Sequence, residues 1–286
     1  MADAPEFAVI IPHYNDMDRL RRCLDALMPQ VGPDVEVVVA DNNSPIDLST
    51  LPGDYPGLRV VIQTEKGAGP ARNKGVAETT APWLMFIDAD CLPAPDWLAV
   101  GRRIARADTV IGGRVDIFDE TDPPRSGAEA FEAVFAFKME RYLREEAFLG
   151  AGNLVTSRAV FDAVGGFRPA VSEDKDWSQR AAKAGFTLDF DNDFAAGHPS
   201  RQDWSALRHK WRRLTAEGFL LDGQGARLRW LIKALLMPAS AVAHAPRVLK
   251  HPGLSDEERA RALITLVRVR LARMGWMVMQ TVTGRA

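Results

Sequence analysis

The stretch of sequence that decides the fold is Trp83-Leu-Met-Phe-Ile-Asp-Ala-Asp90, an apolar run that ends in two aspartates. A short, near-continuous apolar run predicts a strand of a parallel sheet that is covered on both faces. Two carboxylates one residue apart at a strand end can both face an open site, and hard divalent cations prefer oxygen ligands. Asp88 and Asp90 are therefore candidate metal ligands, and the alternative is a strand-ending turn with solvated side chains.

Apolar runs and helical spacing alternate along the chain before this stretch. Strands are predicted over Glu6–Pro12, Val35–Ala40 and Leu58–Ile62, and helices over Asp16–Met28 and Gly69–Glu78, with Pro70 at the first position of the second helix. Strands that alternate with helices at this spacing predict an α/β fold built around a mostly parallel sheet. In such sheets ligands bind beyond the carboxyl ends of the strands.

The pattern changes beyond residue 110. The elements predicted there are a strand over Val110–Ile117, a long helix over Gly127–Ala147, a short strand within Gly150–Thr156, helices over Ser157–Val164 and Ser172–Ala184, and a strand over Phe186–Phe190. Ser172 suits the N-cap of the last of these helices, and Gly185 suits its end. The chain beyond Asp203 is predicted to be helical.

Polar side chains gather at the predicted strand ends. The cluster Asp41-Asn42-Asn43-Ser44 offers donors and acceptors suited to a nucleotide base and ribose, and its alternative is ordinary turn chemistry. Gly67-Ala-Gly-Pro-Ala-Arg-Asn73 opens a helix whose free N–H groups suit an anion, as does Arg72. The alternative there is a capped helix start with a surface arginine. The stretch matches neither a P-loop nor a dinucleotide-binding fingerprint.

Three carboxylates fall in the first turn of the helix that follows Ser172, in the run Glu173-Asp-Lys-Asp-Trp177. Acidic residues there complement the helix dipole; alternatively, one of them is a general base and Trp177 is an apolar wall for a substrate. Spacing alone does not choose among the three acids. His198 follows a predicted strand and is either a packed residue or a metal ligand.

The composition is that of a globular protein, with 286 residues, of which 47% are hydrophobic and 26% charged. These values exclude disordered, collagen-like and low-complexity chains. Cys23 and Cys91 show no pairing pattern, which argues against a disulfide scaffold or a cysteine-based zinc site and indicates a reducing compartment. The first six residues lack a basic start and an apolar run, so we expect no signal peptide and a cytoplasmic location.

The net charge of −2 hides an asymmetry. Residues 201–286 contain 16 Lys or Arg and 6 Asp or Glu, a net charge of +10, whereas residues 1–200 carry −12. The segment Arg259–Met279 is amphipathic, and no apolar run approaches the ~20 residues that span a bilayer. The basic extension is predicted either to lie at the surface of an anionic membrane or to form a helical lid on the preceding domain. No nucleic-acid-binding motif accompanies the charge, so we expect no nucleic-acid partner.

Taken in order, the motifs resemble those of the inverting family 2 glycosyltransferases, which have the GT-A fold. The matching stretches are Val9-Ile-Ile-Pro-His-Tyr-Asn15, Val38-Val-Ala-Asp-Asn-Asn-Ser44, Gly69-Pro-Ala-Arg-Asn-Lys-Gly75, Phe86-Ile-Asp-Ala-Asp90, Gly150-Ala-Gly-Asn153, Gly165-Gly-Phe167 and Glu173-Asp-Lys-Asp-Trp-Ser-Gln-Arg180. The resemblance extends from residue 6 to about residue 220, which would make residues 1–220 a GT-A catalytic domain and leave residues 221–286 as a basic helical extension. Asp-Asn-Asn-Ser stands where the family frequently has Asp-Asp-Gly-Ser, and the family also shows this variant.

The resemblance implies roles for individual residues. The nucleotide-diphosphate sugar would be bound by Pro12, Tyr14, Asn15, Asp41, Asn43, Gly69, Arg72, Asp88 and Ala89. Asp90, together with Asp88 and His198, would hold Mg²⁺ or Mn²⁺. Asp174 would be the catalytic base, and Glu173 and Trp177 would lie at the acceptor site.

The activity that the resemblance implies is transfer of a sugar, with inversion, to a hydroxyl of a glycan or lipid-linked acceptor in polysaccharide biosynthesis. The inner face of the membrane is the expected place for such an acceptor. A sugar-phosphate nucleotidyltransferase, which has a related sheet, would carry Gly-x-Gly-Thr-Arg where Pro12-His-Tyr-Asn15 stands. A non-catalytic protein that binds sugar nucleotides or glycans is the other alternative, and the presence of both Asp90 and Asp174 argues against it.

Overall fold

The computed structural model of the protein describes residues 4–169 and 172–286. Residues 1–3, at the start of the segment where we expected no signal peptide, lie outside the described residues. The chain divides into two compact units. The α/β unit runs to Asp116 and resumes over Phe137–His198, and the helical unit comprises Ile117–Ala136 and Pro199–Ala286.

This division differs from the boundary that we expected at residue 220. The helices α5 (Gly127–Phe135) and α9 (Trp204–Gly218) bury apolar side chains, among them Phe131 and Leu207, in one core with the C-terminal helices. Both therefore belong to the helical unit, although they lie on the N-terminal side of the expected boundary.

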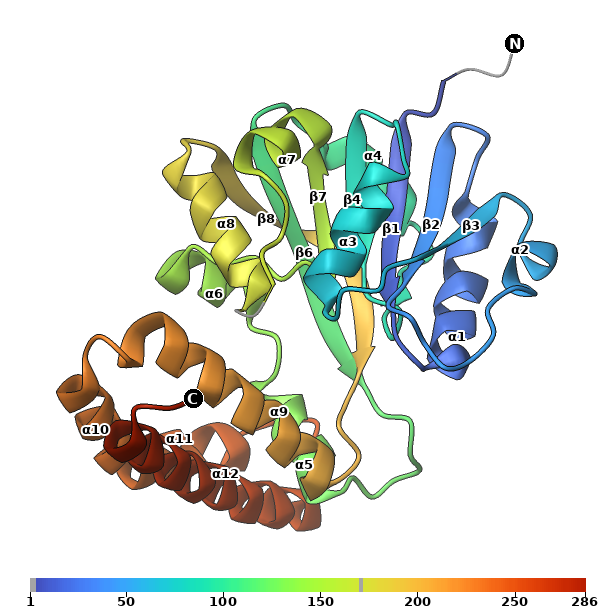
Figure 1. Ribbon diagram of the computed structural model, residues 1–286. Helices are drawn as coiled ribbons and strands as arrows, with labels where there is room; N and C mark the ends of the chain where they lie inside the picture. The colour runs from blue at the N-terminus through green and yellow to red at the C-terminus, as the bar shows by residue number, and fades with distance from the viewer. Residues whose placement is uncertain (1–3, 170–171) are drawn as a thin grey trace. The chain divides into compact units, whose positions relative to one another are not determined.

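Within the described residues the sheet of the α/β unit has eight strands in the order β3-β2-β1-β4-β7-β6-β8-β5 (Figure 1). Their bounds are β1 Phe7–His13, β2 Val35–Asp41, β3 Leu58–Ile62, β4 Trp83–Ile87, β5 Leu92–Pro93, β6 Thr109–Phe118, β7 Asn153–Ser157 and β8 Thr187–Pro199. The half from β3 to β4 is parallel, whereas β7 is antiparallel to both β4 and β6. The mixed α/β sheet confirms the predicted fold class. In its other half β8 runs parallel to β6, because Thr187 N–H donates to the Asp108 carbonyl at the start of the pair and Ser200 N–H to the Phe118 carbonyl at its end.

The register of the strands brings distant polar residues to one edge of the sheet. His13 at the end of β1 is paired with Asp41 at the end of β2. Ile87 at the end of β4 is paired with Asn153 at the beginning of the antiparallel strand β7. Asp88 and the turn before Asn153 therefore lie at this edge, where ligands bind in sheets of this kind.

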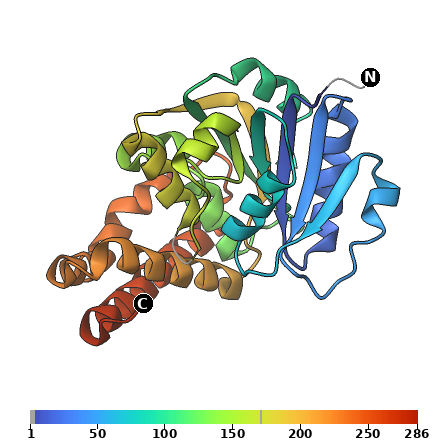
Figure 2. The same cartoon turned by 45° about the horizontal axis from the view of Figure 1, so that its top comes forward.

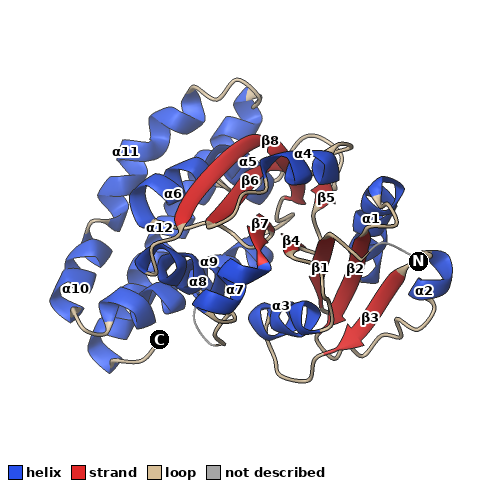
Figure 3. Ribbon diagram, turned by 90° about the horizontal axis from the view of Figure 1, so that it is seen from above, coloured by secondary structure: helices blue, strands red, loops and turns tan. Residues whose placement is uncertain are grey.

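Helices cover both faces of the sheet (Figure 3). The face that includes Val9 and Ile11 packs against α1 (Met17–Leu27) and α4 (Trp97–Ile104). The other face, which includes Ala8 and Ile10, packs against α3 (Ala68–Ala77), α7 (Arg158–Val164) and α8 (Glu173–Lys183). All seven residues of β1 are buried, which explains why the strand is a continuous apolar run.

The structure corrects several local predictions and confirms that Ser172 is the N-cap of α8. The helix expected over residues 127–147 is two helices, α5 and α6 (Met139–Glu146), because the backbone is extended at Ala136, where the chain leaves the helical unit. Pro70 is the third residue of α3, which begins at Ala68. Ser172 occupies the N-cap of α8 without a side-chain capping bond. Strand β8 is longer than expected, and α4 and the four-residue helix α2 (Leu51–Asp54) were not predicted.

The helical unit consists of α5, α9, α10 (Arg227–Leu235), α11 (Met237–Leu249) and α12 (Asp256–Thr283), with a π-helical turn at Phe219–Gly223 (Figures 1 and 2). A capping box of Ser255 and Glu258 begins α12, and Gly284 in the left-handed conformation ends it. Among the described residues no helix has the length and apolar character needed to cross a membrane.

Candidate active site

His13 and Asp41 form a buried pair at the carboxyl edge of the sheet. His13 Nδ1 lies 2.9 Å from Asp41 Oδ1, and the Asp16 N–H donates to His13 Nε2 at 3.1 Å. Because Nε2 accepts that bond, the imidazole proton is on Nδ1 and is donated to Asp41. Ser44 donates to the same carboxylate through its hydroxyl at 2.5 Å and its N–H at 2.9 Å. His13 and Ser44 thus orient Asp41, a role that the sequence did not predict for either of them.

The loops after β1 and β2 present polar side chains around Asp41. Asn15 and Asn43 are exposed and have φ values of 51° and 56°, a left-handed conformation that asparagine tolerates better than most residues. The Asn15 N–H donates to Ser44 Oγ at 2.8 Å, which ties the two loops together. Tyr14 is 63% exposed, whereas Pro12 is buried within β1. A ligand can therefore reach Tyr14, Asn15 and Asn43, whereas Pro12 is buried within the sheet.

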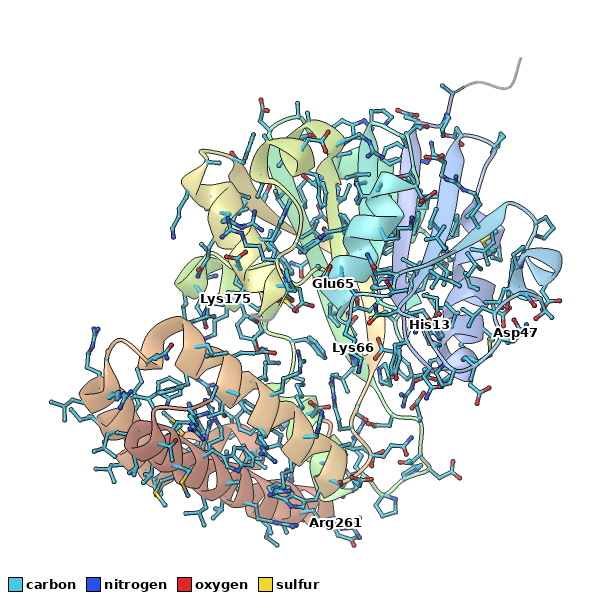
Figure 4. The ribbon with its side chains drawn as sticks, viewed as in Figure 1. His13, Asp47, Glu65, Lys66, Lys175 and Arg261 are labelled. Atoms are coloured by element: carbon cyan, nitrogen blue, oxygen red, sulfur yellow. The ribbon has the colours of Figure 1, made fainter. Side chains whose placement is uncertain are left out.

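Asn42 anchors the loop that leads into α3. Its amide donates to the carbonyls of Gln63 and Glu65, and its carbonyl accepts from the Gly67 N–H at 2.8 Å. His13, Glu65 and Lys66 lie at this edge of the sheet (Figure 4). Gly69 is buried, and a Cβ there would lie 3.1 Å from the Cβ of Phe167. Gly69 therefore serves the packing of α3 in this structure.

Arg72 connects two carboxylates that are far apart in sequence. Its Nη2 donates to Asp88 Oδ1 at 2.6 Å and its Nη1 to Glu173 Oε1 at 3.3 Å. Burial works to lower the pKa of Arg72, but the charges of Asp88 and Glu173 outweigh it, so the pKa is raised. The Arg72 Nε is buried without a hydrogen-bond partner. A permanent cation with a spare donor at this edge suits an anionic ligand.

The turn after β4 holds the candidate metal ligands. The Asp88 N–H donates to the Gly152 carbonyl at 3.3 Å, and a Cβ on Gly152 would collide with the Asp88 carboxylate. Ala89 between the two aspartates is nearly buried. Asp90 Oδ2 lies 3.4 Å from His198 Nε2, which brings together groups 108 residues apart in the chain. A side chain at Gly152 would therefore force the Asp88 carboxylate out of the position that it takes beside Arg72.

The donor set of Asp90 and His198 fits a divalent transition-metal ion in part. A carboxylate oxygen and an imidazole nitrogen are suitable ligands for Mn²⁺. Among the described residues no group of three or more His, Cys, Asp and Glu side chains could hold a metal ion by itself. Asp88 is already paired with Arg72 through one oxygen. A cation bound here would therefore need further ligands from a substrate, and a diphosphate supplies them.

The structure distinguishes the three acids at the start of α8. Glu173 is paired with Arg72, and Asp176 accepts from Arg180 Nε at 2.8 Å. Asp174 has no ion pair among the described residues, and its Oδ1 accepts only the N–H of Lys175 at 2.9 Å. Burial, followed by the charge of Glu173, raises the pKa of Asp174 to about 6 against the opposing effect of Arg72. A carboxylate with that pKa has the properties of a general base.

Trp177 lies in the core and not on an open face, which corrects its expected place at the acceptor site. Its side chain is 0% exposed and packs between Phe161 and Phe167, with ring centroids 5.8 and 5.4 Å away. The indole N–H donates to the Gly165 carbonyl at 2.8 Å. A fully buried indole cannot touch an acceptor, so Trp177 instead holds α8 and the preceding turn in position.

The chain is similar to known proteins in sequence. The family described as glycosyl transferase family 2 matches residues 8–168. The glycosyltransferase AglE of Haloferax volcanii is 30% identical over 222 residues, which are 73% of this chain and 71% of that protein. The succinoglycan biosynthesis protein ExoO of Rhizobium meliloti is 33% identical over 107 residues, 36% of this chain and 30% of that protein.

Solved structures share the fold. The Pyrobaculum calidifontis mannosyltransferase PcManGT, solved in complex with GDP-Man and Mn²⁺, has a TM-score of 0.64 at 16% identity and covers 99% of this chain and 88% of its own. Residues 1–349 of S. aureus TarS, solved in complex with UDP-GlcNAc, have a TM-score of 0.55 at 17% identity, covering 98% of this chain and 92% of theirs. Both likenesses concern the fold, and they confirm the GT-A architecture.

Proposed function

The chain belongs to glycosyltransferase family 2, and from this premise we propose that it transfers a sugar from a nucleotide-diphosphate sugar to an acceptor hydroxyl by direct displacement with inversion. The observation that carries the proposal is the separation of the acids on α8, which leaves Asp174 unpaired and with a pKa of about 6 beside paired Glu173 and Asp176. A base of this kind is what displacement by a hydroxyl requires.

The donor is held, in this proposal, by the carboxyl edge of the sheet. Asp41 already accepts three hydrogen bonds from His13 and Ser44, so about one of the roughly four lone-pair sites of its carboxylate is left for an N–H group of a base. The exposed side chains of Tyr14 and Asn43 flank the base and nucleoside. Arg72 leaves one of its carboxylate partners to bind the diphosphate, and its spare Nε strengthens the attraction.

Asp90 and His198 are the residues that would hold Mg²⁺ or Mn²⁺, with Asp88 facing the ribose and the cation. Such a cation would supply Lewis-acid stabilisation of the negative charge that develops on the leaving diphosphate. Asp174 takes the proton of the acceptor hydroxyl on the opposite side of the sugar from the leaving group. Glu173 contributes to the acceptor side and keeps the pKa of Asp174 raised through its charge.

The proposal is tested by a screen of donors without any acceptor. We expect UDP-, GDP- or dTDP-sugars to raise the melting temperature of the protein when Mn²⁺ or Mg²⁺ is present, with slow release of free sugar from the preferred donor. A ligand that binds the folded protein but not the unfolded chain raises the free energy of unfolding by RT ln(1 + [L]/Kd). At a ligand concentration 100 times Kd this increase is about 2.7 kcal/mol. An increase in melting temperature with nucleoside triphosphates and sugar phosphates but not with nucleotide-diphosphate sugars would contradict the proposal and favour a nucleotidyltransferase.

We also propose that the helical unit contacts the cytoplasmic face of an anionic membrane, where a lipid-linked acceptor is found. Of the exposed large hydrophobic residues in the described chain, all but Tyr14 and Ile62 lie between Leu220 and Val282. Those on α12 recur at helical spacing, namely Ile264, Val267, Leu271, Met279 and Val282. The sequence from residue 223 onward contains 11 Lys or Arg and 3 Asp or Glu. Exposed apolar stripes among basic residues are typical of helices that lie in a bilayer surface.

Vesicle flotation tests the membrane contact. We expect the protein to float with vesicles that contain about 30% phosphatidylglycerol and to float less as salt increases, because each basic residue contributes about 1 kcal/mol near an anionic surface. Ile264→Glu with Leu271→Glu should reduce the floated fraction at least fivefold, because both side chains are exposed on α12. Ala77→Glu with Ala99→Glu adds the same charge to exposed positions of the α/β unit and should not. Equal losses in both variants would contradict this surface.

A further inference from the structure

Three arginines form a cluster in the helical unit: Arg247 on α11, and Arg270 and Arg273 on α12, which is referred to below as the arginine cluster. Arg270 Nη2 lies 3.2 Å from His244 Nδ1, which joins α12 to α11. The guanidinium of Arg273 lies 4.7 Å from the ring centroid of Trp211 on α9. The cluster therefore sits where three helices of this unit meet.

Carboxylates do not neutralise the arginine cluster. Other basic residues of the helical unit have acidic partners, such as Arg261 with Glu257 and Lys210 with Glu132. No described residue forms an ion pair with Arg247, Arg270 or Arg273. On α11 and α12 the only acids are Asp256, Glu257 and Glu258 in the first turn of α12, and Glu217 on α9 is paired with Arg213.

Buried donors of the cluster point to an absent acceptor. The Nε atoms of Arg270 and Arg273 are buried without a hydrogen-bond partner, as is the indole nitrogen of Trp211 beside Arg273. Burial and the charge of Arg270 lower the pKa of Arg273 to about 10, and burial and the charge of Arg247 lower the pKa of Arg270. Folding thus holds like charges together in a place with reduced access to water, which costs free energy unless an anion compensates it.

We propose that the arginine cluster, with Trp211 beside it, binds a phosphate group. Guanidinium groups bind phosphate oxygens through paired N–H bonds, and the match is better for arginine than for lysine. The phosphate belongs either to a lipid headgroup or to a soluble phosphorylated ligand. Because Arg247 is exposed, a phosphate group can reach the arginine cluster from solvent. The site lies within the helical unit and does not depend on the donor site that we propose in the α/β unit.

Binding of inorganic phosphate and of monomeric dihexanoyl phosphatidic acid to the full-length protein tests the site. EDTA is included so that no divalent metal contributes, and ionic strength is matched with chloride. We expect both probes to bind, and Arg270→Gln with Arg273→Gln to weaken binding at least tenfold. Arg270→Lys with Arg273→Lys keeps the charge but loses the paired N–H geometry, so it should weaken binding by a smaller factor and guards against a folding defect.

Arg229→Gln with Arg285→Gln is the matched control, because it removes the same charge from exposed positions of the helical unit. The control should bind both probes as the wild type does. If the wild type binds phosphatidic acid more tightly than phosphate, and the Gln variant loses this difference, the phosphate comes from a lipid headgroup. If the wild type binds both probes with equal affinity, it comes from a soluble ligand. The proposal is overturned if neither probe binds, if the Gln variant binds as the wild type does, or if the control loses as much affinity.

Discussion

Asp174→Asn is expected to lower kcat of sugar transfer by about 10²- to 10⁴-fold, the usual contribution of a general base. The asparagine is isosteric but cannot accept the proton of the acceptor hydroxyl. Affinity for the donor should stay within about twofold, because the residues assigned to the nucleotide lie at the ends of β1, β2 and β4 and on α3, and none of them is on α8. Initial rates at saturating donor, with donor affinity from calorimetry, measure both effects. Near-normal turnover by the variant would exclude Asp174 as the base.

The pH profile gives a second measure of the same residue. Only the ionised form of Asp174 accepts a proton, and its pKa is raised to about 6. The wild-type kcat/KM should therefore increase about tenfold per pH unit below pH 6 and level off above it. The residual activity of Asp174→Asn should lack this step.

Stability should change in the opposite direction from activity. Because the pKa of Asp174 rises from 3.8 in the unfolded chain to about 6 in the folded protein, the folded state binds its proton more tightly. Stability then decreases as pH rises from about 4 to about 6, and above that the full cost of the buried charge remains. Asp174→Asn removes this cost and should raise the free energy of unfolding by about 1–3 kcal/mol at pH 7.5.

Asp176→Asn is the matched control for this variant. It makes the same chemical change two residues along α8, where the carboxylate is paired with Arg180. We expect kcat within a few-fold of the wild type and a stability unchanged or lower by about 1 kcal/mol, since an ion pair is lost. A stability gain in Asp176→Asn as large as that in Asp174→Asn would show that the effect is general for the acidic first turn.

Asp90→Asn is expected to have the second-largest effect, a loss of two or more orders of magnitude in kcat/KM. A neutral amide is a poor ligand for a divalent cation, and loss of several kcal/mol of charge stabilisation corresponds to a loss of this size. The affinity for Mn²⁺ in the presence of nucleoside diphosphate, measured by calorimetry, should decrease in parallel. This measurement does not depend on turnover. His198→Gln should weaken Mn²⁺ binding less, because Asp90 is retained.

Asp96→Asn controls for the loss of one negative charge near this turn. Asp96 is exposed at the N-cap of α4, where its side chain makes no capping bond. The Asp96→Asn variant should bind Mn²⁺ with the affinity of the wild type and should have the same kcat/KM. Unchanged Mn²⁺ affinity in Asp90→Asn would remove Asp90 from the metal site, whatever its effect on turnover.

The fold class could be predicted because its signals are local. The strand over Trp83–Ile87 and those over Leu58–Ile62 and Val35–Asp41 were found within one residue of their observed ends. A strand buried on both faces must be apolar at successive positions, whichever elements cover it. Asp88 and Asp90, directly after Ile87, indicated where the strand ends at the edge of the sheet. Burying an aspartate without a partner costs free energy, so the buried strand had to end before them.

The direction of the antiparallel strand β7 could not be predicted in this way. Strand β7 is five buried residues long and its sequence is compatible with either direction. Its direction follows from its pairing with β4, which is 66 residues earlier at the register of Ile87 and Asn153. The division of the chain was missed for a related reason, because α5 joins helices that are more than 100 residues later in the sequence.

The sequence by itself determined the alternation of strands and helices, the family, and the positions of candidate acids and bases along the chain. Only the tertiary structure decided what each of them contacts. Arg72 reaches Glu173 across 101 residues and leaves Asp174 unpaired, His13 fixes Asp41 across 28 residues, and Trp177 is enclosed in the core. Secondary structure depends on local backbone and burial preferences, whereas the charge, burial and partner of a side chain depend on groups that folding brings from distant parts of the sequence.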